Sequence, residues 1–451
     1  MIPFIENWGG SSLQPDPPHA DSPVSSERPA YVAEALLLLV SFAGYASVSV
    51  LPVFTQTDSR VFTEPFRYLV VGLTLFTLFR IRKSSFTREV NVFLVLYAGL
   101  WYMMFLRMFW HFFYPMYSAD DKTLFELFQF SLGSTFLPTL AILLRGNKKA
   151  SEIASRFLAI VLPLDCILVL YCAFFVVPQE DAYIRLSLPT LNPISVGYLG
   201  VTTLIVAVWR HAPAARSLVG RNLAMIWKVF SAIIGLVALG LSASKGPIVS
   251  MLVVVMVAVI AKEDPATKLR MAMRAIAVIA AGILILVGVE QETHYKPLLR
   301  ISEAMNPAQA AEEEVRGSLI EKSLEQFVEN PLFGGGIVER ESGQYPHNIF
   351  VESLLLAGVL GGVLCIGVVA YSAIRAWHLV VAGGEFAWVG LIFVQRLVSV
   401  QFSGSLYTAS EFWAAAALVM ALAGRFAMDA KNGAPERSSG EERTSFAEGR
   451  A

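Results

Sequence analysis

The residues with the clearest chemical potential stand where a long apolar segment begins, in QYPHNIFVESLLLAGVLGG at 344–362. Pro346 fixes the start of this segment and predicts that His347 lies in the first turn of a helix. A helix N-terminus has partial positive charge and free N–H groups, which attract an anion and favour neutral imidazole. Neutral imidazole near pH 7 is suited to act as a general base. A lone histidine at a membrane interface is more often structural, so both interpretations are open.

A second helix start has similar features, in GLSASKGPIVS at 240–250. The residues Ser242 to Ser244 predict a tight turn, and Pro247 stands where a first-turn proline is tolerated. Lys245 is therefore expected at a helix N-terminus, beside the hydroxyl group of Ser244. A lysine at a membrane boundary is usually an anchor, but at a positive helix end it is misplaced unless an anion is bound there. Two such helix starts, together with arginines, predict a site for a diphosphate.

Four further polar side chains are candidates for contacts with a substrate. Arg316 has Glu312 and Glu313 nearby in sequence, so a local ion pair is the alternative explanation. Arg300 stands in KPLLRIS, which contains no recognised motif. Glu352 and Arg396 lie inside apolar segments, where a charge is costly and normally faces the bundle interior with a partner. A structural ion pair is the alternative for each of these two.

The composition defines the setting of these residues. Of the 451 residues, 55% are hydrophobic and 16% are charged, and the mean hydropathy is +0.58. Because a helix needs roughly 20 apolar residues to cross the hydrocarbon core, the pattern predicts about twelve membrane helices in an all-α polytopic protein. The predicted segments are near 33–53, 65–81, 90–110, 124–144, 156–177, 194–209, 225–242, 246–261, 272–290, 347–371, 384–402 and 405–424.

The cations indicate an orientation. Lys and Arg concentrate in the connections at 80–88, 145–156, 210–221 and 262–274, and they are sparser in the connections between these. Positive charge is retained on the cytoplasmic side, so both termini are predicted to be cytoplasmic and His347 to face the periplasm. The leader 1–32 and the tail 425–451 are polar and predicted to be disordered, with 33–290 and 347–424 in the membrane.

The long hydrophilic connection at 291–346 is predicted to be one large periplasmic loop. Within it, Val315, Leu319, Leu324, Phe327 and Val328 would share one face of an amphipathic helix, which Pro331 and Gly334 to Gly336 would end. Such a helix either lies on the membrane surface or is a plain solvated helix. The three cysteines, Cys166, Cys172 and Cys365, fall in apolar segments, and no His, Asp and Cys cluster predicts a metal site.

Three stretches in fixed order resemble the O-antigen ligase and polymerase family of bacterial envelope glycosyltransferases. They are SASKGPIVSML, VRGSLIEKSLEQFVENPLFGGG and PHNIFVESLLLAGVLGG, and the resemblance covers about residues 225–375. It implies glycan transfer on the periplasmic face of the inner membrane, from undecaprenyl diphosphate to a sugar hydroxyl on the lipid A core or on another lipid-linked glycan.

By the same resemblance, His347 takes the place of the family's essential histidine and Arg316 that of its loop arginine. Lys245 stands where the family usually has arginine, and lysine cannot bind phosphate bidentately. We expect His347, Arg316 and Lys245 to be catalytic, with no cofactor, no metal and no nucleic-acid partner. The predicted substrate contacts are Arg300, Asn348, Ser244, Glu352 and Arg396.

Alternatives remain at this point. The motifs do not separate a ligase from an O-antigen or exopolysaccharide polymerase, and the Lys245 variation favours the polymerase slightly. A transporter or a lipid-linked glycan flippase also has many helices, but such folds usually show paired halves, and no internal repeat is evident here. A scaffold without catalytic function would leave the cations at the two helix starts unexplained.

Overall fold

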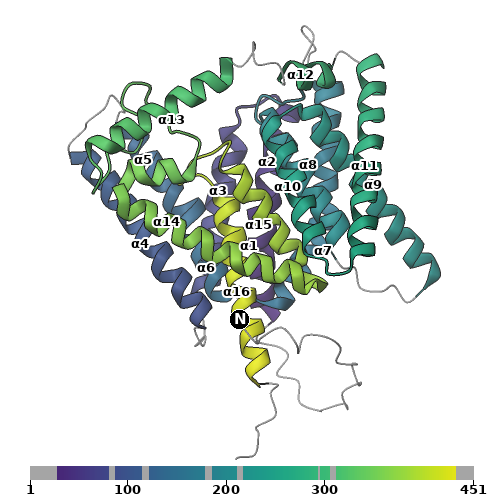
Figure 1. Ribbon diagram of the computed structural model, residues 1–451, viewed down its shortest axis with the longest axis horizontal. Coiled ribbons are helices and arrows are strands. Elements are labelled where there is room, and N and C mark those ends of the chain that lie inside the picture. The colour runs from purple at the N-terminus through teal and green to yellow at the C-terminus, as the bar shows by residue number, and fades with distance from the viewer. Residues whose placement is uncertain are drawn as a thin grey trace, which may run out of the picture.

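The computed structural model describes residues 28–80, 87–113, 121–177, 185–210, 217–292, 295–304 and 311–432. These residues form a bundle of helices joined by loops, with α12 and α13 at one end and the C-terminal end of α16 at the other (Figure 1). The prediction of a disordered leader over 1–32 and a disordered tail over 425–451 is wrong at both inner edges, because residues 28–32 belong to the first helix and residues 425–432 to the last one. The rest of both segments lies outside the described residues.

Each of the twelve predicted apolar segments contains helical structure, but residues 405–409 of the last segment form a loop. The first segment corresponds to α1 (Arg28–Leu39), η1 (Val40–Gly44) and α2 (Tyr45–Thr55), the second to α3 (Arg60–Phe79) and the third to α4 (Arg88–Phe113). The fourth corresponds to α5 (Asp121–Phe130), η2 (Ser131–Phe136) and α6 (Leu137–Arg145). The fifth corresponds to α7 (Lys148–Tyr171) and η3 (Cys172–Val176), and the sixth to α8 (Pro193–Trp209). The other six correspond to α9 (Leu218–Ser242), α10 (Lys245–Ile260), α11 (Pro265–Glu292), α14 (Ile349–Ala382), η5 (Gly384–Phe386) with α15 (Ala387–Ser399), and α16 (Ser410–Asn432).

The described part of the chain contains 8 helical segments long and apolar enough to span a membrane. The shorter apolar helices α8 and α10 lie among them. The polytopic all-α class is therefore confirmed, while the number of twelve spans stays a prediction.

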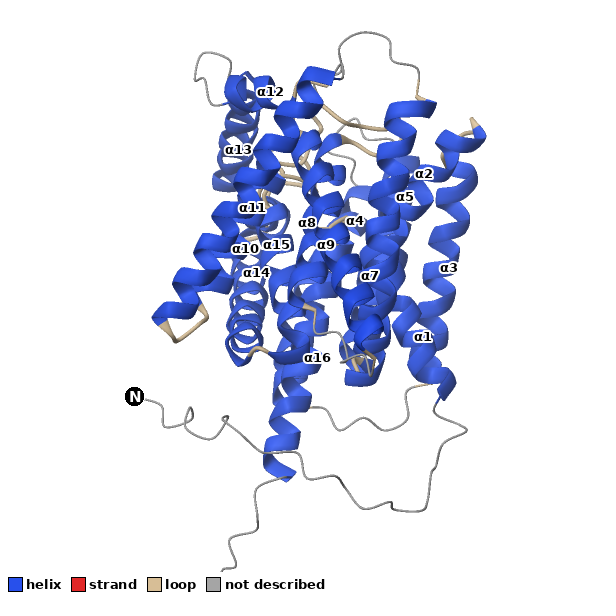
Figure 2. Ribbon diagram, turned by 90° about the vertical axis from the view of Figure 1, so that its right-hand side faces the viewer, coloured by secondary structure: helices blue, strands red, loops and turns tan. Residues whose placement is uncertain are grey.

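The helices differ in how completely they are buried. On α8 every residue from Val196 to Ala207 is buried, and on α16 every residue from Phe412 to Leu422 is buried. By contrast, α9 and α11 expose large apolar side chains along their length, among them Ile226, Met273 and Leu284. Figure 2 shows where these two helices run in the bundle. A helix that is apolar on all sides belongs in the interior, and an exposed apolar surface of this kind suits contact with lipid tails.

The prediction of one continuous helix over 347–371 is wrong. α14 contains a break at Ala357 and Gly358, where the backbone leaves the helical region and Gly358 has φ +64°. A Cβ atom at Gly358 would lie 2.4 Å from the Leu332 carbonyl oxygen, so only glycine fits at this position.

The loop that follows α13 (Ala311–Glu329) fills this break. The amide groups of Gly335 and Gly336 donate to the Leu355 carbonyl at 2.7 and 3.0 Å, and the Val359 amide donates to the Pro331 carbonyl at 2.8 Å. These bonds satisfy backbone groups that the break leaves without helical partners. The three glycines at 334–336 therefore do more than end a helix.

Arg107 of α4 completes the same junction from the side. Its guanidinium donates to the Leu356 carbonyl at 3.0 Å, to the Gly334 carbonyl at 2.8 Å and to the Phe333 carbonyl. One arginine thus joins α4, the loop and the broken helix.

The amphipathic face predicted for α13 is only partly correct. Leu319 is buried, but Leu324 and Val328 are exposed, and the buried side chains on the following turns are Ser323 and Gln326. Gln326 is buried because its carbonyl oxygen accepts from the Arg340 amide at 3.0 Å. Polar contacts with the loop, rather than the most apolar face, therefore decide how α13 is rotated. The side chain of Val315 lies outside the described residues.

Candidate active site

His347 precedes the helix start rather than lying in its first turn, which corrects the prediction. α14 begins at Ile349 with Asn348 as its N-cap, and the Asn348 side chain accepts from the amides of Phe350 and Val351 at 3.1 and 3.2 Å. His347 has φ +54°, a left-handed conformation that is uncommon outside glycine. Strained backbone of this kind gathers at functional sites.

The half-buried imidazole of His347 is held on two sides. The Tyr345 ring meets it edge to face with 4.6 Å between ring centroids, and the imidazole donates to the Gly404 backbone. Burial, followed by the positive charge of Arg316, lowers the pKa of His347 below its ordinary value of 6.5. Among the described residues, the buried Nδ1 atom has no hydrogen-bond partner. The imidazole is therefore neutral near pH 7 and has one nitrogen available for a proton.

The prediction of a helix start at Lys245 is confirmed. α10 begins at Lys245 after the N-cap Ser244, and Ala243 has φ +44° in the turn before it. The Ser244 hydroxyl donates to the Ser242 carbonyl at 2.9 Å and makes no cap bond to α10. The Lys245 side chain is exposed.

Tyr198 of α8, which the sequence did not single out, connects the separate parts of the site. A Cβ atom at Gly246 would lie 2.9 Å from the Tyr198 hydroxyl oxygen, so the start of α10 adjoins this phenol. The charges of Arg396 and Arg316 both act on the same phenol. Since Arg316 also acts on His347, the starts of α10 and α14 converge at one end of the bundle.

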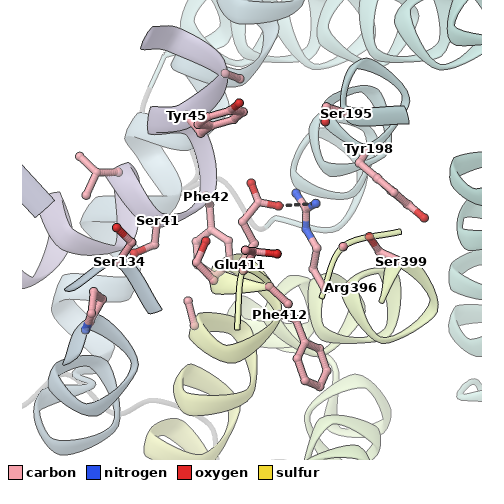
Figure 3. Close-up of a pocket in the computed structure, with 18 of the residues that line it drawn as sticks. Ser41, Phe42, Tyr45, Ser134, Ser195, Tyr198, Arg396, Ser399, Glu411 and Phe412 are labelled. Atoms are coloured by element: carbon pink, nitrogen blue, oxygen red, sulfur yellow. Dashed lines mark ion pairs between the residues drawn. The ribbon is translucent and has the colours of Figure 1, made fainter. Parts of the chain in front are cut away.

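Arg396 is buried at the base of this region, with 7% of the residue exposed. Its guanidinium forms an ion pair with Glu411, donates to the Thr202 hydroxyl at 3.0 Å and lies 5.8 Å from the centre of the Tyr198 ring. The structural ion pair that the sequence analysis gave as the alternative for Arg396 is thus present, and the partner is Glu411. Figure 3 shows the two side chains facing each other from α15 and α16.

The Arg396–Glu411 pair lines a cavity of about 460 Å³. Aromatic rings and hydroxyl groups from distant parts of the chain line the same space, including Tyr45, Phe66, Ser134, Ser195 and Tyr198 (Figure 3). His347 is not part of the lining, but Gly404, which accepts its hydrogen bond, is. The cavity and the imidazole therefore share the loop at 400–409 as a common wall.

Glu352 holds that wall in place. Its carboxylate accepts from the Leu406 amide at 2.7 Å, and the residue is 0% exposed. In this structure Glu352 supports the loop from behind and does not face the cavity. The bond from the Thr135 hydroxyl to the Tyr407 carbonyl, 3.0 Å long, supports the loop from η2.

The structure brings together His347, Arg316, Lys245 and Arg396, with Ser244 and Asn348 at the two helix starts. The side chains of Arg300, Glu312 and Glu313 lie outside the described residues, so neither the role of Arg300 nor a local ion pair of Arg316 is tested. Sequence reasoning missed Tyr198, Glu411 and Arg107. A charge inside an apolar segment was the available signal for Arg107, which stands in FLRMFW.

The fold and this geometry define a class of protein: a polytopic helical membrane protein with a half-buried imidazole, several cations and a cavity at the end that carries α13. Residues 230–366 match the family model described as O-antigen ligase. The resemblance to the O-antigen ligase and polymerase family is thereby confirmed, and it indicates a membrane enzyme of the glycosyltransferase type. A search of curated proteins gave no match to the chain.

Proposed function

We propose that the protein transfers a glycan from undecaprenyl diphosphate to the hydroxyl group of an acceptor sugar on the periplasmic face of the inner membrane. The observation that carries this proposal is the pairing of a neutral, half-buried imidazole at His347 with the charge of Arg316. The family match over residues 230–366 supports the reaction class.

In the proposed reaction, His347 takes the proton from the acceptor hydroxyl as that oxygen attacks the anomeric carbon. The bond between this carbon and the diphosphate oxygen breaks, and undecaprenyl diphosphate leaves with the negative charge. Arg316 and Lys245 stabilise that charge, so the leaving group needs no general acid. One displacement predicts inversion at the anomeric carbon, and the described residues contain no group of three potential metal ligands that suggests a metal-assisted route.

The cavity beside the imidazole fits the sugar end of such a substrate. Rings of Tyr45, Phe66 and Tyr198 offer apolar faces, and Ser134 and Ser195 offer hydroxyl groups. Sugars present both kinds of surface. Arg396 and Glu411 would bind sugar hydroxyls there, while Tyr198 links the cavity to the cations around the diphosphate.

A reconstituted assay tests the proposal. The full chain in liposomes is given a lipid-linked glycan and a sugar acceptor, and the product's anomeric configuration is read by NMR with and without a chelator. Inversion and full activity with the chelator are expected. A retained configuration would exclude single displacement, and loss of activity with the chelator would exclude the metal-independent route.

The acceptor separates a ligase from a polymerase, which is the second candidate because Lys245 replaces the family's usual arginine. Deleting the gene and separating surface glycans on a gel gives the answer. Loss of a ligase leaves polymer that is not attached to lipid A, whereas loss of a polymerase leaves cores with a single repeat. Unchanged glycans would contradict both candidates, as would transport of a lipid-linked glycan without transfer.

A further inference from the structure

A second cavity, of about 350 Å³, lies where α8 and α14 end. It is lined by the last residues of α8, by the two glycines that follow α14, and by three cations: one on α9 and two that follow the ends of α8 and α10. The lining residues are Val208, Trp209, Arg210, Lys228, Lys262, Gly383, Gly384 and Ala387. None of them belongs to the region around His347.

Three of these residues are cations: Arg210, Lys228 and Lys262. Within the described residues, no ion pair joins any of them to a carboxylate. The charges that act on them are also positive, because Arg156 acts on Arg210 and Arg210 acts on Lys228. Burial, followed by the charge of Arg156, lowers the pKa of Arg210 below its ordinary value. Like charges gathered in one hollow repel each other and favour an anion between them.

Helix termini explain only part of this arrangement. Arg210 follows the last residue of α8 and Lys262 follows the end of α10, where carbonyl groups carry partial negative charge and attract cations. Lys228, however, lies inside α9, well away from either end of that helix. Lys228 lines the same cavity, although no helix terminus of α9 lies there to attract its positive charge.

The floor of the cavity is open to a ligand. Gly383 and Gly384 have φ +68° and +72°, and a Cβ atom at Gly384 would meet nothing within 4 Å. The nearest atom to a Cβ at Gly383 is the Lys262 Nζ atom at 4.0 Å. Next to the cavity, α9 exposes Met225, Ile226 and Val229, which form an apolar flank. A lipid with an anionic headgroup would place its phosphate among the cations and its chains along this flank.

We propose that the cavity lined by Arg210, Lys228 and Lys262 binds a phosphate group, carried by an anionic phospholipid or by a soluble phosphate compound. Three convergent cations supply charge-assisted hydrogen bonds to the phosphate oxygens. The site lies apart from the transfer site, so its test does not depend on the proposed glycosyltransferase activity.

The test uses the full-length protein, stripped of lipid in detergent and titrated with phosphatidylglycerol or phosphatidylcholine under native mass spectrometry. The wild type is expected to bind phosphatidylglycerol more tightly than phosphatidylcholine. The double variant Lys228→Gln, Lys262→Gln is expected to lose at least about ten-fold in affinity for phosphatidylglycerol. A parallel arm measures the thermal midpoint of both proteins with added inorganic phosphate, and stabilisation of the wild type alone identifies a soluble phosphate as the ligand.

Two controls make the result specific. Arg221→Gln removes an exposed cation from the same helix, two turns before Lys228, outside the cavity lining. It should bind like the wild type, and the conservative variant Lys228→Arg, Lys262→Arg should retain binding. Equal losses in Arg221→Gln and in the double variant would overturn the proposal. So would a wild type that shows neither lipid preference nor stabilisation by phosphate.

Discussion

The surroundings of the two cavities hold their polar and charged side chains in different ways. At the end that carries α13, charged side chains are fixed by specific partners: Arg107 by three carbonyls, Glu352 by the Leu406 amide, and Arg396 by Glu411. At the other end, Arg210, Lys228 and Lys262 line a hollow with no carboxylate paired to them among the described residues.

The difference suggests different tasks. A site for bond making needs groups held within a fraction of an ångström, and this requires a second layer of side chains behind them. A site that holds a phosphate needs mainly an excess of positive charge. Fixed partners therefore mark the candidate active site, and cations without carboxylate partners mark the candidate phosphate site.

The largest expected effect is the loss of transfer rate in the variant His347→Ala. Removing a general base should lower the transfer rate by about 10²- to 10⁴-fold, because no neighbouring group replaces the imidazole. The rate is measured in the reconstituted assay, and the amount of folded protein by gel filtration. His378→Gln, which changes an exposed histidine near the other end of α14, is the matched control and should leave the rate unchanged. Near-normal turnover in His347→Ala would show that another group is the base.

The next largest expected effect is a smaller loss of transfer rate in the variant Arg316→Gln. Removing one group that stabilises the leaving diphosphate should lower the rate by about 10²- to 10³-fold while the thermal midpoint in detergent stays the same. Arg340→Gln is the control, since Arg340 lies in the same connection and forms an exposed ion pair with Glu329. A parallel fall in protein level and activity for Arg316→Gln would favour a purely structural role.

Glu411→Gln tests the ion pair that lines the cavity. The change leaves Arg396, 7% exposed, without its counter-charge, and breaking a buried pair in this way costs about 3–5 kcal/mol. The thermal midpoint in detergent should therefore fall clearly. Breaking the exposed pair of Lys322 and Glu341 by Lys322→Gln should change it little. Equal midpoints for the two variants would contradict the distinction between the buried ion pair and the exposed one.

Gly358→Ala tests the break in α14. Gly358 has φ +64° and ψ −156°, a conformation that essentially only glycine adopts and that costs a residue with a side chain about 1–3 kcal/mol. The new methyl group would also overlap the Leu332 carbonyl. We expect a lower thermal midpoint and reduced transfer, because the junction positions the loop after α13. Gly288→Ala is the control, since a Cβ atom there meets nothing within 4 Å.

The smallest effect is the pH dependence of transfer. The base acts when neutral, and the pKa of His347 lies below 6.5 because of burial and Arg316. The rate should therefore be constant from about pH 6.5 upward and fall only as the pH drops through the lowered pKa. In Arg316→Gln the pKa should rise toward its ordinary value, so the fall should begin at a higher pH. A profile that still rises above pH 7 would exclude His347 as the base.

Much of the fold was predictable from the sequence because the hydrocarbon core dictates helix length and composition. Each predicted apolar segment contains helix, although the last helix begins at Ser410 rather than at 405, and Lys245 was placed correctly at a helix start. Errors arose where a polar backbone bond outweighed the local pattern. The break at Gly358 follows from the loop at 331–336, which no pattern within α14 could indicate.

The sequence alone determined that this is a polytopic helical protein, and its motifs identified His347, Arg316 and Lys245 as one set. Only the tertiary structure decided that Tyr198 joins the two helix starts, that Glu411 rather than Glu352 pairs with Arg396, and that three cations meet at the far end. The physical reason is that spacing along the chain fixes which residues share a helix face. Contacts between residues as far apart as Arg107 and Gly334 depend instead on how helices pack, and a single sequence does not encode that in any local pattern.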